Sequence, residues 1–225
     1  MKTVIVERRM KFMRIVSCFF LLMLMSAAAM ALEEPDYEVV TKYDEFELRQ
    51  YAPYIVAEVD VPGDMDGADN KAFRILAGYI FGDNEAAEKM EMTAPVESRS
   101  AKRGEKMAMT APVTASVADE DGTMTYAFVM ERKYTLETLP RPLDERIRIR
   151  VVPARTMAVR RYSGRWTEKN YLQHRETLQT ALQAEGIETI GAPTLARYNS
   201  PFSLPFMRRN EVMIETLPVS ANTAE

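Results

Sequence analysis

The sequence has very little cysteine and histidine: one cysteine, Cys18, and one histidine, His174. Because Cys18 lies in the N-terminal segment, the rest of the chain has no disulfide, no cysteine-ligated zinc site and no cysteine nucleophile. A single histidine also argues against a histidine-rich metal centre and against a Ser-His-Asp triad.

Signature motifs of common enzymes are missing as well. The sequence contains no glycine-rich phosphate loop, no Gly-x-Ser-x-Gly and no His-Glu-x-x-His. The chain has a net charge of -4, and its first 31 residues carry five Lys/Arg and one Glu, so the rest carries about -8. Such an acidic body lacks the basic surface of a nucleic-acid-binding protein. We therefore expect a non-enzymatic binding protein with no nucleic-acid partner.

The N-terminal segment has the order of a secretory signal. A basic stretch over residues 8–14 precedes an apolar run over 15–25, and Ala29-Met30-Ala31 is an A-x-A cleavage site. We predict a signal peptide over residues 1–31, cut before Leu32, and a mature protein that is periplasmic or secreted. The alternative is an uncleaved membrane anchor, since the apolar stretch is just long enough to span a bilayer.

The rest of the chain, residues 32–225, is expected to form a single domain that is ordered from about 35 to 217. Helical periodicity predicts helices over residues 68–81 and from the cap Thr167 to about 185. Alternation and turn residues predict a hairpin over 37–51 and strands over 54–61, 90–98, 107–117, 124–131, 146–152, 156–162, 193–199 and 211–217. This order predicts an α+β fold made by duplication, with two helices on a curved antiparallel sheet.

A short internal repeat is the first candidate for a binding site. Lys89 to Val96 reads Lys-Met-Glu-Met-Thr-Ala-Pro-Val, and Lys106 to Val113 repeats seven of these eight residues. Methionine is flexible and polarisable, so Met92 and Met109 could line an apolar ligand site, and sulfur is also a haem ligand. The alternative is that both methionines pack in the core of the sheet.

The second candidate is a proline-containing stretch between Arg197 and Glu211. It carries four apolar residues and then two arginines: Phe202, Leu204, Phe206, Met207, Arg208 and Arg209. An apolar loop beside two guanidinium groups suits a flat ligand that carries carboxylates. The alternative is a loop that packs on the sheet while one of the arginines pairs with a structural carboxylate.

Two further positions are weaker candidates. His174 could ligate a metal or haem, but its helical spacing also fits a histidine at the edge of the apolar stripe. Tyr162 and Trp166 flank Gly164 before the second helix, where we expect a packed turn rather than a stacking platform.

Several of these segments together resemble one known family. The two Lys-Met-x-Met-Thr-Ala-Pro-Val units, the Tyr-Asn-Ser-Pro-Phe stretch, Arg-Arg-Asn-Glu-Val from Arg208 to Val212 and Glu-Leu-Arg-Gln-Tyr from Glu47 to Tyr51 are similar to segments of the SOUL haem-binding protein family. The resemblance spans roughly Pro35 to Leu217, in the same order, and fits the plant and bacterial branch best.

The resemblance implies a fold of duplicated strand-helix-strand repeats that form a distorted antiparallel β-barrel flanked by two helices. It also implies that haem or another tetrapyrrole binds non-covalently in an apolar groove beside the first helix. Gln50 stands where one animal branch is thought to use an axial histidine, and Asn70 stands at one of the charged helix positions of another branch. The resemblance therefore implies a mainly hydrophobic site with no clear axial ligand and with arginine or lysine holding the propionates.

We take ten residues as candidate contacts of this ligand. They are Phe73, Ala77, Ile80, Met92, Met109, Phe202, Phe206, Met207, Arg208 and Arg209.

Three functions remain open at this point. The first is an exported tetrapyrrole-binding protein that carries, buffers or scavenges haem or porphyrin. The second is a binding module for another amphipathic small molecule, because the same fold resembles the effector-binding domains of bacterial multidrug-responsive regulators, which bind flat cations. The third is an envelope protein-interaction module that uses an exposed loop over residues 202–207. None of these requires stable membrane insertion after signal cleavage.

Overall fold

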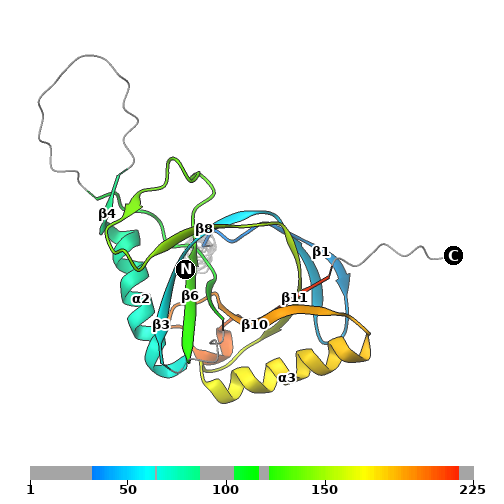
Figure 1. Cartoon of the computed structure of the whole chain (residues 1–225). Helices are drawn as coiled ribbons and strands as arrows, with labels where there is room; N and C mark the ends of the chain where they lie inside the picture. Colours follow the sequence, from blue (N-terminus) through cyan, green and yellow to red (C-terminus); the bar gives the residue numbers. More distant parts are fainter. Residues whose placement is uncertain (1–31, 64, 87–103, 117–121, 218–225) are drawn as a thin grey trace, which may run out of the picture. The chain divides into compact units, whose positions relative to one another are not determined.

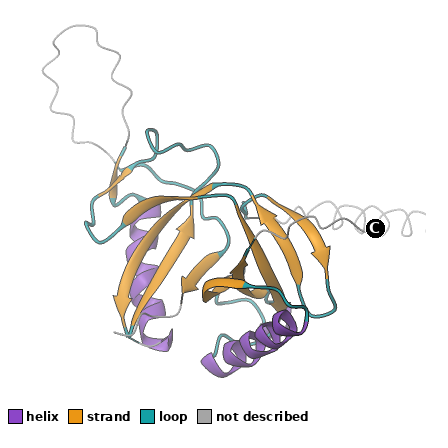
Figure 2. Ribbon diagram, turned by 45° about the vertical axis from the view of Figure 1, so that its right-hand side comes forward, coloured by secondary structure: helices purple, strands orange, loops and turns teal. Residues whose placement is uncertain are grey.

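The computed structural model describes residues 32–63, 65–86, 104–116 and 122–217, and the chain from Glu33 onward forms one compact unit. A strongly curled antiparallel sheet of nine strands forms a half-barrel, and two long helices lie outside it (Figures 1 and 2). Within the described residues, no helix combines the length and the apolar character needed to cross a bilayer.

The elements follow one another in the order expected for a duplicated domain. They are β1 (Tyr37–Lys42), β2 (Glu47–Tyr51), β3 (Tyr54–Pro62), α2 (Met65–Phe81), β4 (Asn84–Glu85), β5 (Val113–Ser116), β6 (Thr123–Val129), β7 (Arg141–Pro142), β8 (Arg148–Val152), β9 (Arg155–Tyr162), α3 (Glu168–Ala184), β10 (Thr189–Arg197), the 3-10 turn η1 (Pro205–Met207) and β11 (Asn210–Thr216).

The strand order shows the duplication directly. The nine strands lie in the order β1-β2-β9-β11-β10-β5-β6-β3-β8, while β4 and β7 form a separate two-stranded sheet. Read from the β1 edge toward the middle, four strands follow in the order β2-β9-β11-β10. Read from the β8 edge toward the middle, the strands follow in the corresponding order β8-β3-β6-β5. Each half lends one strand to the other, because β2 pairs with β9 and β8 pairs with β3. The predicted α+β distorted barrel with two flanking helices is therefore confirmed.

Each helix covers its own half of the sheet. Helix α2 packs on β3 and β6, and α3 packs on β9 and β11. The Thr167 side chain accepts a hydrogen bond from the Asn170 backbone N–H, so the predicted N-cap of α3 is confirmed. Tyr171, Leu178 and Leu182 of α3 are buried against the sheet, as their helical spacing predicts. Removing this apolar surface from water is what holds the helix on the sheet.

One predicted strand is much shorter than expected. The pattern over residues 107–117 predicts a strand, but only Val113–Ser116 forms one. The preceding residues hydrogen bond to loops and helix ends instead: Met107 N–H to the Ile80 carbonyl and Ala108 N–H to the Glu131 carboxylate. Pro112 has no N–H to give to a ladder, so regular pairing begins after it. The predicted strand over 90–98 lies outside the described residues.

Candidate functional site

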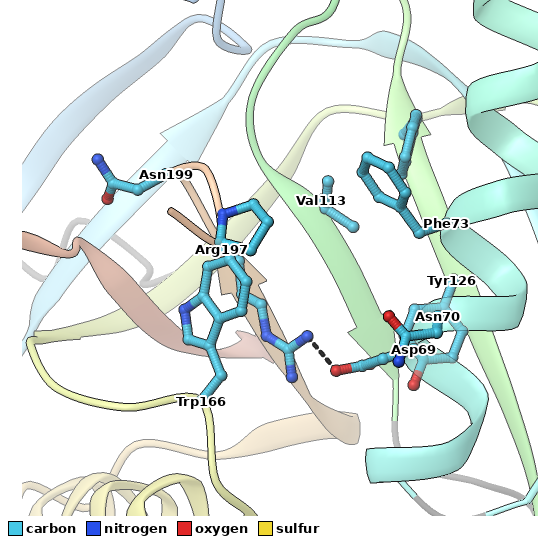
Figure 3. Close-up of a pocket in the computed structure, with 10 residues that line it drawn as sticks. Asp69, Asn70, Phe73, Val113, Tyr126, Trp166, Arg197 and Asn199 are labelled. Atoms are coloured by element: carbon cyan, nitrogen blue, oxygen red, sulfur yellow. Dashed lines mark hydrogen bonds and ion pairs between the residues drawn. The ribbon is translucent and has the colours of Figure 1, made fainter. Parts of the chain in front are cut away.

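A cavity of about 340 Å³ lies where the two halves of the sheet meet, beside the N-terminal half of α2 (Figure 3). Its walls come from α2, β5, β6, β10, the turn before α3 and the loop after β10. They are Asp69, Asn70, Phe73, Val113, Tyr126, Phe128, Trp166, Arg197, Asn199 and Pro201.

The periodicity of the elements explains why these side chains meet. Asp69 and Phe73 are four residues apart and so lie on one side of α2. Tyr126 and Phe128 are two residues apart and so lie on one face of β6. The rings of Phe73 and Phe128 are 5.6 Å apart, which makes one aromatic wall of the cavity. Phe73 keeps 42% of its surface exposed, so this wall stays open to a ligand.

Trp166 forms the opposite wall and is held by three polar neighbours. Its Nε1–H donates a 2.7 Å hydrogen bond to Oδ1 of Asn210. The guanidinium carbons of Arg197 and Arg208 lie 5.0 Å and 4.4 Å from the centre of its ring. Both distances are within the range of a cation–π contact, so two positive groups gather on one indole.

Arg197 also forms an ion pair across the cavity with Asp69 of α2, drawn as a dashed line in Figure 3. The two side chains are 11% and 22% exposed, so the pair is largely removed from water. Among the described residues, three of its buried polar atoms have no hydrogen-bond partner: Oδ1 of Asp69 and Nε and Nη2 of Arg197. Buried donors and acceptors are normally satisfied, so these three atoms mark a place prepared for another molecule or for water.

The two arginines predicted to bind the ligand separate in the structure. Arg208 stays beside the cavity, where its Nε and Nη2 donate to the carbonyls of Ser203 and Pro201 at 2.9 Å and 2.7 Å. Arg209 points instead into a second group of polar side chains, where it pairs with Glu34 and Glu211. The loop alternative, in which an arginine holds a structural carboxylate, therefore describes Arg209.

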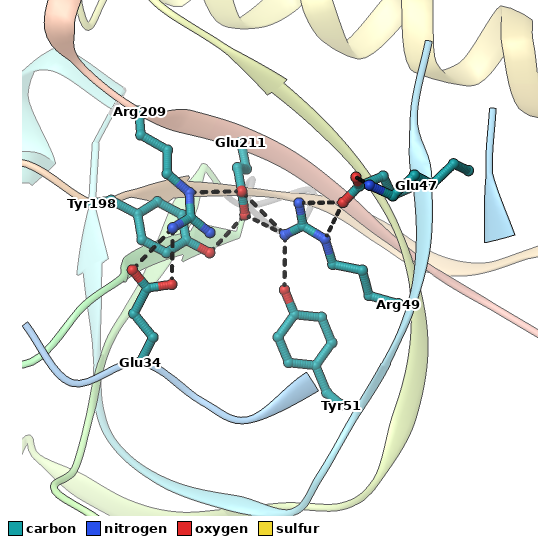
Figure 4. A network of polar contacts seen from close by, with 8 residues as sticks. Glu34, Glu47, Arg49, Tyr51, Tyr198, Arg209 and Glu211 are labelled. Atoms are coloured by element: carbon teal, nitrogen blue, oxygen red, sulfur yellow. Dashed lines mark hydrogen bonds and ion pairs between the residues drawn. The ribbon is translucent and has the colours of Figure 1, made fainter. Parts of the chain in front are cut away.

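This second group, the Glu211 cluster, consists of Glu34, Arg49, Tyr198, Arg209 and Glu211 (Figure 4). The Glu211 side chain is fully buried and accepts from Arg49 at 3.1 Å, from Arg209 at 2.9 Å and from the Tyr198 hydroxyl at 2.6 Å. Burial and then the charge of Glu211 raise the pKa of the Tyr198 hydroxyl well above its usual range. Burial alone would lower the pKa of Arg209, but Glu211 and its other partners raise it.

The other predicted ligand contacts, on α2 and in the methionine repeat, differ in whether they line the cavity and in how deeply they are buried. Phe73 lines the cavity. Ala77 and Ile80 are 8% and 2% exposed and are not among the residues that line it. Met109 is half-buried and packs against the main core. Met92 lies outside the described residues.

The predicted apolar loop projects into solvent next to the cavity. Phe202 is 95% exposed, and Leu204, Phe206 and Met207 are also exposed. Pro201, at the start of this loop, lines the cavity. The structure therefore places a row of uncovered apolar side chains close to the cavity wall, and the packed-loop alternative does not describe them.

His174 lies on α3, away from the residues that line the cavity. Its ring stacks on Tyr162 with centroids 4.1 Å apart, and its Nδ1 accepts from Arg160 Nε at 3.3 Å. Burial, followed by the positive charge of Arg160, lowers the pKa of the imidazole. These contacts favour the neutral ring at the edge of the apolar stripe.

Sequence reasoning missed Asp69 and Arg197 and expected Trp166 to be a packed turn. Asp69 and Arg197 are 128 residues apart in the chain, so no local pattern connects them. The sequence feature that could have drawn attention to Trp166 as a site residue is that it is the one tryptophan of the sequence. It lies in the turn between β9 and α3, and this turn meets residues of the other half only because of the order of the strands in the sheet.

Comparison with known proteins agrees with this architecture. The family model of the SOUL heme-binding protein matches residues 32–215. Heme-binding protein 2 of Homo sapiens is 28% identical over 194 residues, which cover 84% of this chain and 88% of the human protein. Heme-binding protein 2 of Mus musculus is 28% identical over 190 residues, covering 82% and 86% of the two chains.

Solved structures with much lower identity share the fold. The C-terminal domain of EcmrR aligns with a TM-score of 0.55 and 10% identity over 81% of this chain and 99% of that domain. A protein described as a hydrolase from Listeria innocua aligns with a TM-score of 0.51 and 13% identity over 79% of this chain and 94% of its own. At such identities the likeness concerns the fold alone. The family match spans almost the whole described unit, and this chain belongs to the SOUL heme-binding protein family.

Proposed function

We propose that this protein is an exported, non-enzymatic tetrapyrrole-binding protein that carries, buffers or scavenges haem or porphyrin. The family match and the names of the two mammalian relatives support binding of a tetrapyrrole. The observation that carries the proposal to this chain is the aromatic cavity beside α2, where Arg197 and Arg208 both lie over Trp166.

The residues of the cavity suit a planar, amphipathic ring. Phe73 and Trp166 offer apolar surface to its faces, with the buried Phe128 ring packed against Phe73, and the guanidinium groups suit carboxylates at its edge. A volume of about 340 Å³ lies near the lower end of the range for small-molecule sites. A tetrapyrrole would therefore place one edge in the cavity and extend past Pro201 toward the exposed apolar side chains of the loop over residues 202–207.

Binding would be driven mainly by burial of apolar surface. The described lining residues include no histidine, methionine or cysteine, and the hydroxyl of the lining tyrosine, Tyr126, donates to the Met65 carbonyl at 3.4 Å. We therefore expect the chain to contribute mainly stacking, charge and exclusion of water. Each Å² of apolar surface removed from water contributes roughly 25 cal/mol before the cost of ordering side chains is subtracted. A bound haem would supply its own redox and ligand chemistry, and this chain would hold it through the ring and the propionates.

The test compares haemin with metal-free protoporphyrin IX, following the Soret band of each during titration with the purified protein. We expect saturable 1:1 binding of both with affinities within about 3-fold of each other, since stacking and propionate contacts do not depend on the iron. Binding of haemin alone, with the sharp Soret shift of a ligated iron, would contradict a site of this kind. Saturable binding of neither compound would remove the tetrapyrrole function.

A second candidate ligand is a flat organic cation. The Asp69 carboxylate faces the cavity with one buried oxygen that has no partner among the described residues, and a carboxylate attracts cations. Ethidium is a suitable probe. If ethidium binds more tightly than protoporphyrin IX and Asp69→Asn abolishes its binding, the cation is the better description of the ligand.

Export is part of the proposal. It is supported by the position of the compact unit, which begins at Glu33, just after the predicted cleavage site. Glu33 and Glu34 are the second and third residues after the predicted cleavage site, and they form ion pairs with Arg132 and Arg209. Cleavage before Leu32 would therefore leave the anchored part of the chain intact. N-terminal sequencing of the protein recovered from a periplasmic extract should read Leu-Glu-Glu-Pro, whereas a sequence that starts upstream of residue 15 would favour the uncleaved anchor.

A further inference from the structure

The guanidinium group of Arg197 is only partly used inside the protein. Its Nη1 is held by the Asp69 carboxylate, while Nε and Nη2 are buried with no partner in the described part of the chain. These two nitrogens form one edge of the guanidinium plane, and their N–H bonds run parallel. A carboxylate can accept from both of them at once.

The same edge holds carboxylates elsewhere in this chain. Arg146 donates to Asp144 through Nε at 2.9 Å and through Nη2 at 2.6 Å. Arg49 likewise donates to Glu47 through Nε and Nη2, both at 2.9 Å. Arg197, which lines the cavity, thus keeps without a partner an edge that other arginines of the protein use on carboxylates.

The surroundings of this edge favour an acidic, planar ligand. Arg197 lies 5.0 Å from the centre of the Trp166 ring, so a carboxylate on Arg197 brings the rest of its molecule beside an aromatic surface. Arg208 lies over the same ring and, within the described residues, its guanidinium bonds to carbonyls rather than to a carboxylate. Asp69, Arg197 and Arg208 together therefore leave one positive charge without a negative counterpart.

We propose that the Nε–Nη2 edge of Arg197 is the receptor for a carboxylate of the ligand and that the site selects planar aromatic acids over their neutral esters. Asp69 is a positioning residue, because it holds Nη1 and so fixes the guanidinium plane of Arg197 at the wall of the cavity. The inference rests on the proposed function where the ligand is a tetrapyrrole, but the same edge serves any planar aromatic carboxylate that the cavity admits.

The test measures acids against their esters. The probes are protoporphyrin IX with its dimethyl ester and 1-pyrenebutyrate with its methyl ester. They are titrated against wild-type protein, Arg197→Lys, Arg197→Gln and Arg175→Gln. Arg175→Gln is the matched control, because Arg175 also has a buried, unpartnered Nε but does not line the cavity. Melting temperatures of all four proteins show whether each variant is folded.

We expect wild-type protein to bind each acid about 10-fold or more tightly than its ester, in line with hydrogen bonds to a charged group. Arg197→Gln should abolish this preference and leave ester affinity within about 2-fold of wild type. Arg197→Lys should recover only part of the preference, since an ammonium group has no paired edge. Arg175→Gln should behave as wild type.

Equal losses for acid and ester in the Arg197 variants would overturn the inference, as would an acid preference that survives Arg197→Gln. If porphyrins bind without an Arg197-dependent preference, the inference fails and the tetrapyrrole function stands. If neither porphyrin binds and the pyrene pair shows the Arg197-dependent preference, the tetrapyrrole function fails and the inference stands. No saturable binding of any probe would overturn both.

Discussion

Two groups of buried arginines in this protein differ in how completely they are satisfied. In the Glu211 cluster, Arg49 and Arg209 share a fully buried carboxylate, and no polar side-chain atom of the three residues is buried without a partner. In the cavity, Arg197 pairs with Asp69 and still keeps two buried nitrogens without a partner within the described residues. The comparison separates an ion network whose polar atoms all have partners from an arginine that the described residues leave partly unsatisfied.

The two groups of arginines differ in hydrogen bonding because they lie at different places in the fold. The Glu211 cluster joins β2 and β11, the two neighbours of β9 in the sheet, with the segment before β1. The Asp69–Arg197 pair joins α2 of one half to β10 of the other, beside a cavity that the side chains do not fill. Buried polar groups with complete partners rigidify a fold, whereas incomplete ones are costly unless something else satisfies them.

The largest effect is expected from breaking the satisfied cluster. Glu211→Ala would leave Arg49 and Arg209 buried without their shared carboxylate, and we expect the free energy of unfolding to fall by about 3–5 kcal/mol. Urea denaturation followed by circular dichroism measures this change. Asp144→Ala is the matched control, since it removes the carboxylate partner of an arginine, Arg146, whose side chain is exposed to solvent. This substitution should barely move the urea midpoint. A loss for Glu211→Ala no larger than for Asp144→Ala would contradict a structural role.

The next effect concerns the aromatic wall of the cavity. Phe73→Ala should weaken protoporphyrin IX binding by about 5- to 30-fold, because it removes roughly 1–2 kcal/mol of ring burial from the complex. Phe81→Ala is a close control, as Phe81 is on the same helix and is more exposed, at 55% against 42%, but does not line the cavity. Equal affinities of the two variants, measured from the Soret band, would place the ligand elsewhere.

A smaller change of the opposite sign is expected from the counter-ion of Arg197. Asp69→Asn keeps a hydrogen-bonding group beside Nη1 but removes a negative charge, so protoporphyrin IX affinity should rise about 3- to 10-fold. The dimethyl ester should bind as before, since it carries no charge for Asp69 to repel. A fall in the affinity for protoporphyrin IX alone would indicate instead that the charge of Asp69 is needed to hold Arg197 in place.

The smallest effect concerns pH. Burial lowers the pKa of His174 below the ordinary value of 6.5, so the unfolded chain takes up its proton at a higher pH than the folded chain. The stability due to neutral His174 is therefore present above pH 6.5 and is lost as the pH falls below it. His174→Gln should reduce this loss between pH 7.5 and 5.5 in urea denaturation. An imidazole NMR titration with a midpoint at or above 6.5 would contradict the reasoning.

Much of the fold could be predicted from the sequence because it depends on local patterns. Both long helices, the cap Thr167 and most strands follow from periodicity and turn residues. The short strand β5 was predicted too long, because hydrophobic alternation does not reveal that Ala108 and Thr110 bond to Glu131 and Val129 outside a ladder. Whether such residues join a strand depends on hydrogen-bond partners that are distant in the sequence.

The candidate site was less predictable for the same reason. Phe73 and Arg208 lie at the cavity as the resemblance and the loop composition suggested. Arg209, next to Arg208, contacts different partners, because successive side chains of an extended segment face opposite sides. Asp69 and Arg197 come together only when β10 lies beside β5, an order that no single segment of the sequence contains.

The most direct test of the account uses Trp166, because it is the one tryptophan of the sequence and it lines the cavity. Its fluorescence should be quenched by protoporphyrin IX in a saturable way that ends at one equivalent, with the same dissociation constant as the Soret change. Addition of excess 1-pyrenebutyrate should reverse the Soret change by displacing the porphyrin. A saturable Soret change that leaves the Trp166 emission unquenched would show that the tetrapyrrole binds elsewhere, and it would contradict the proposed site.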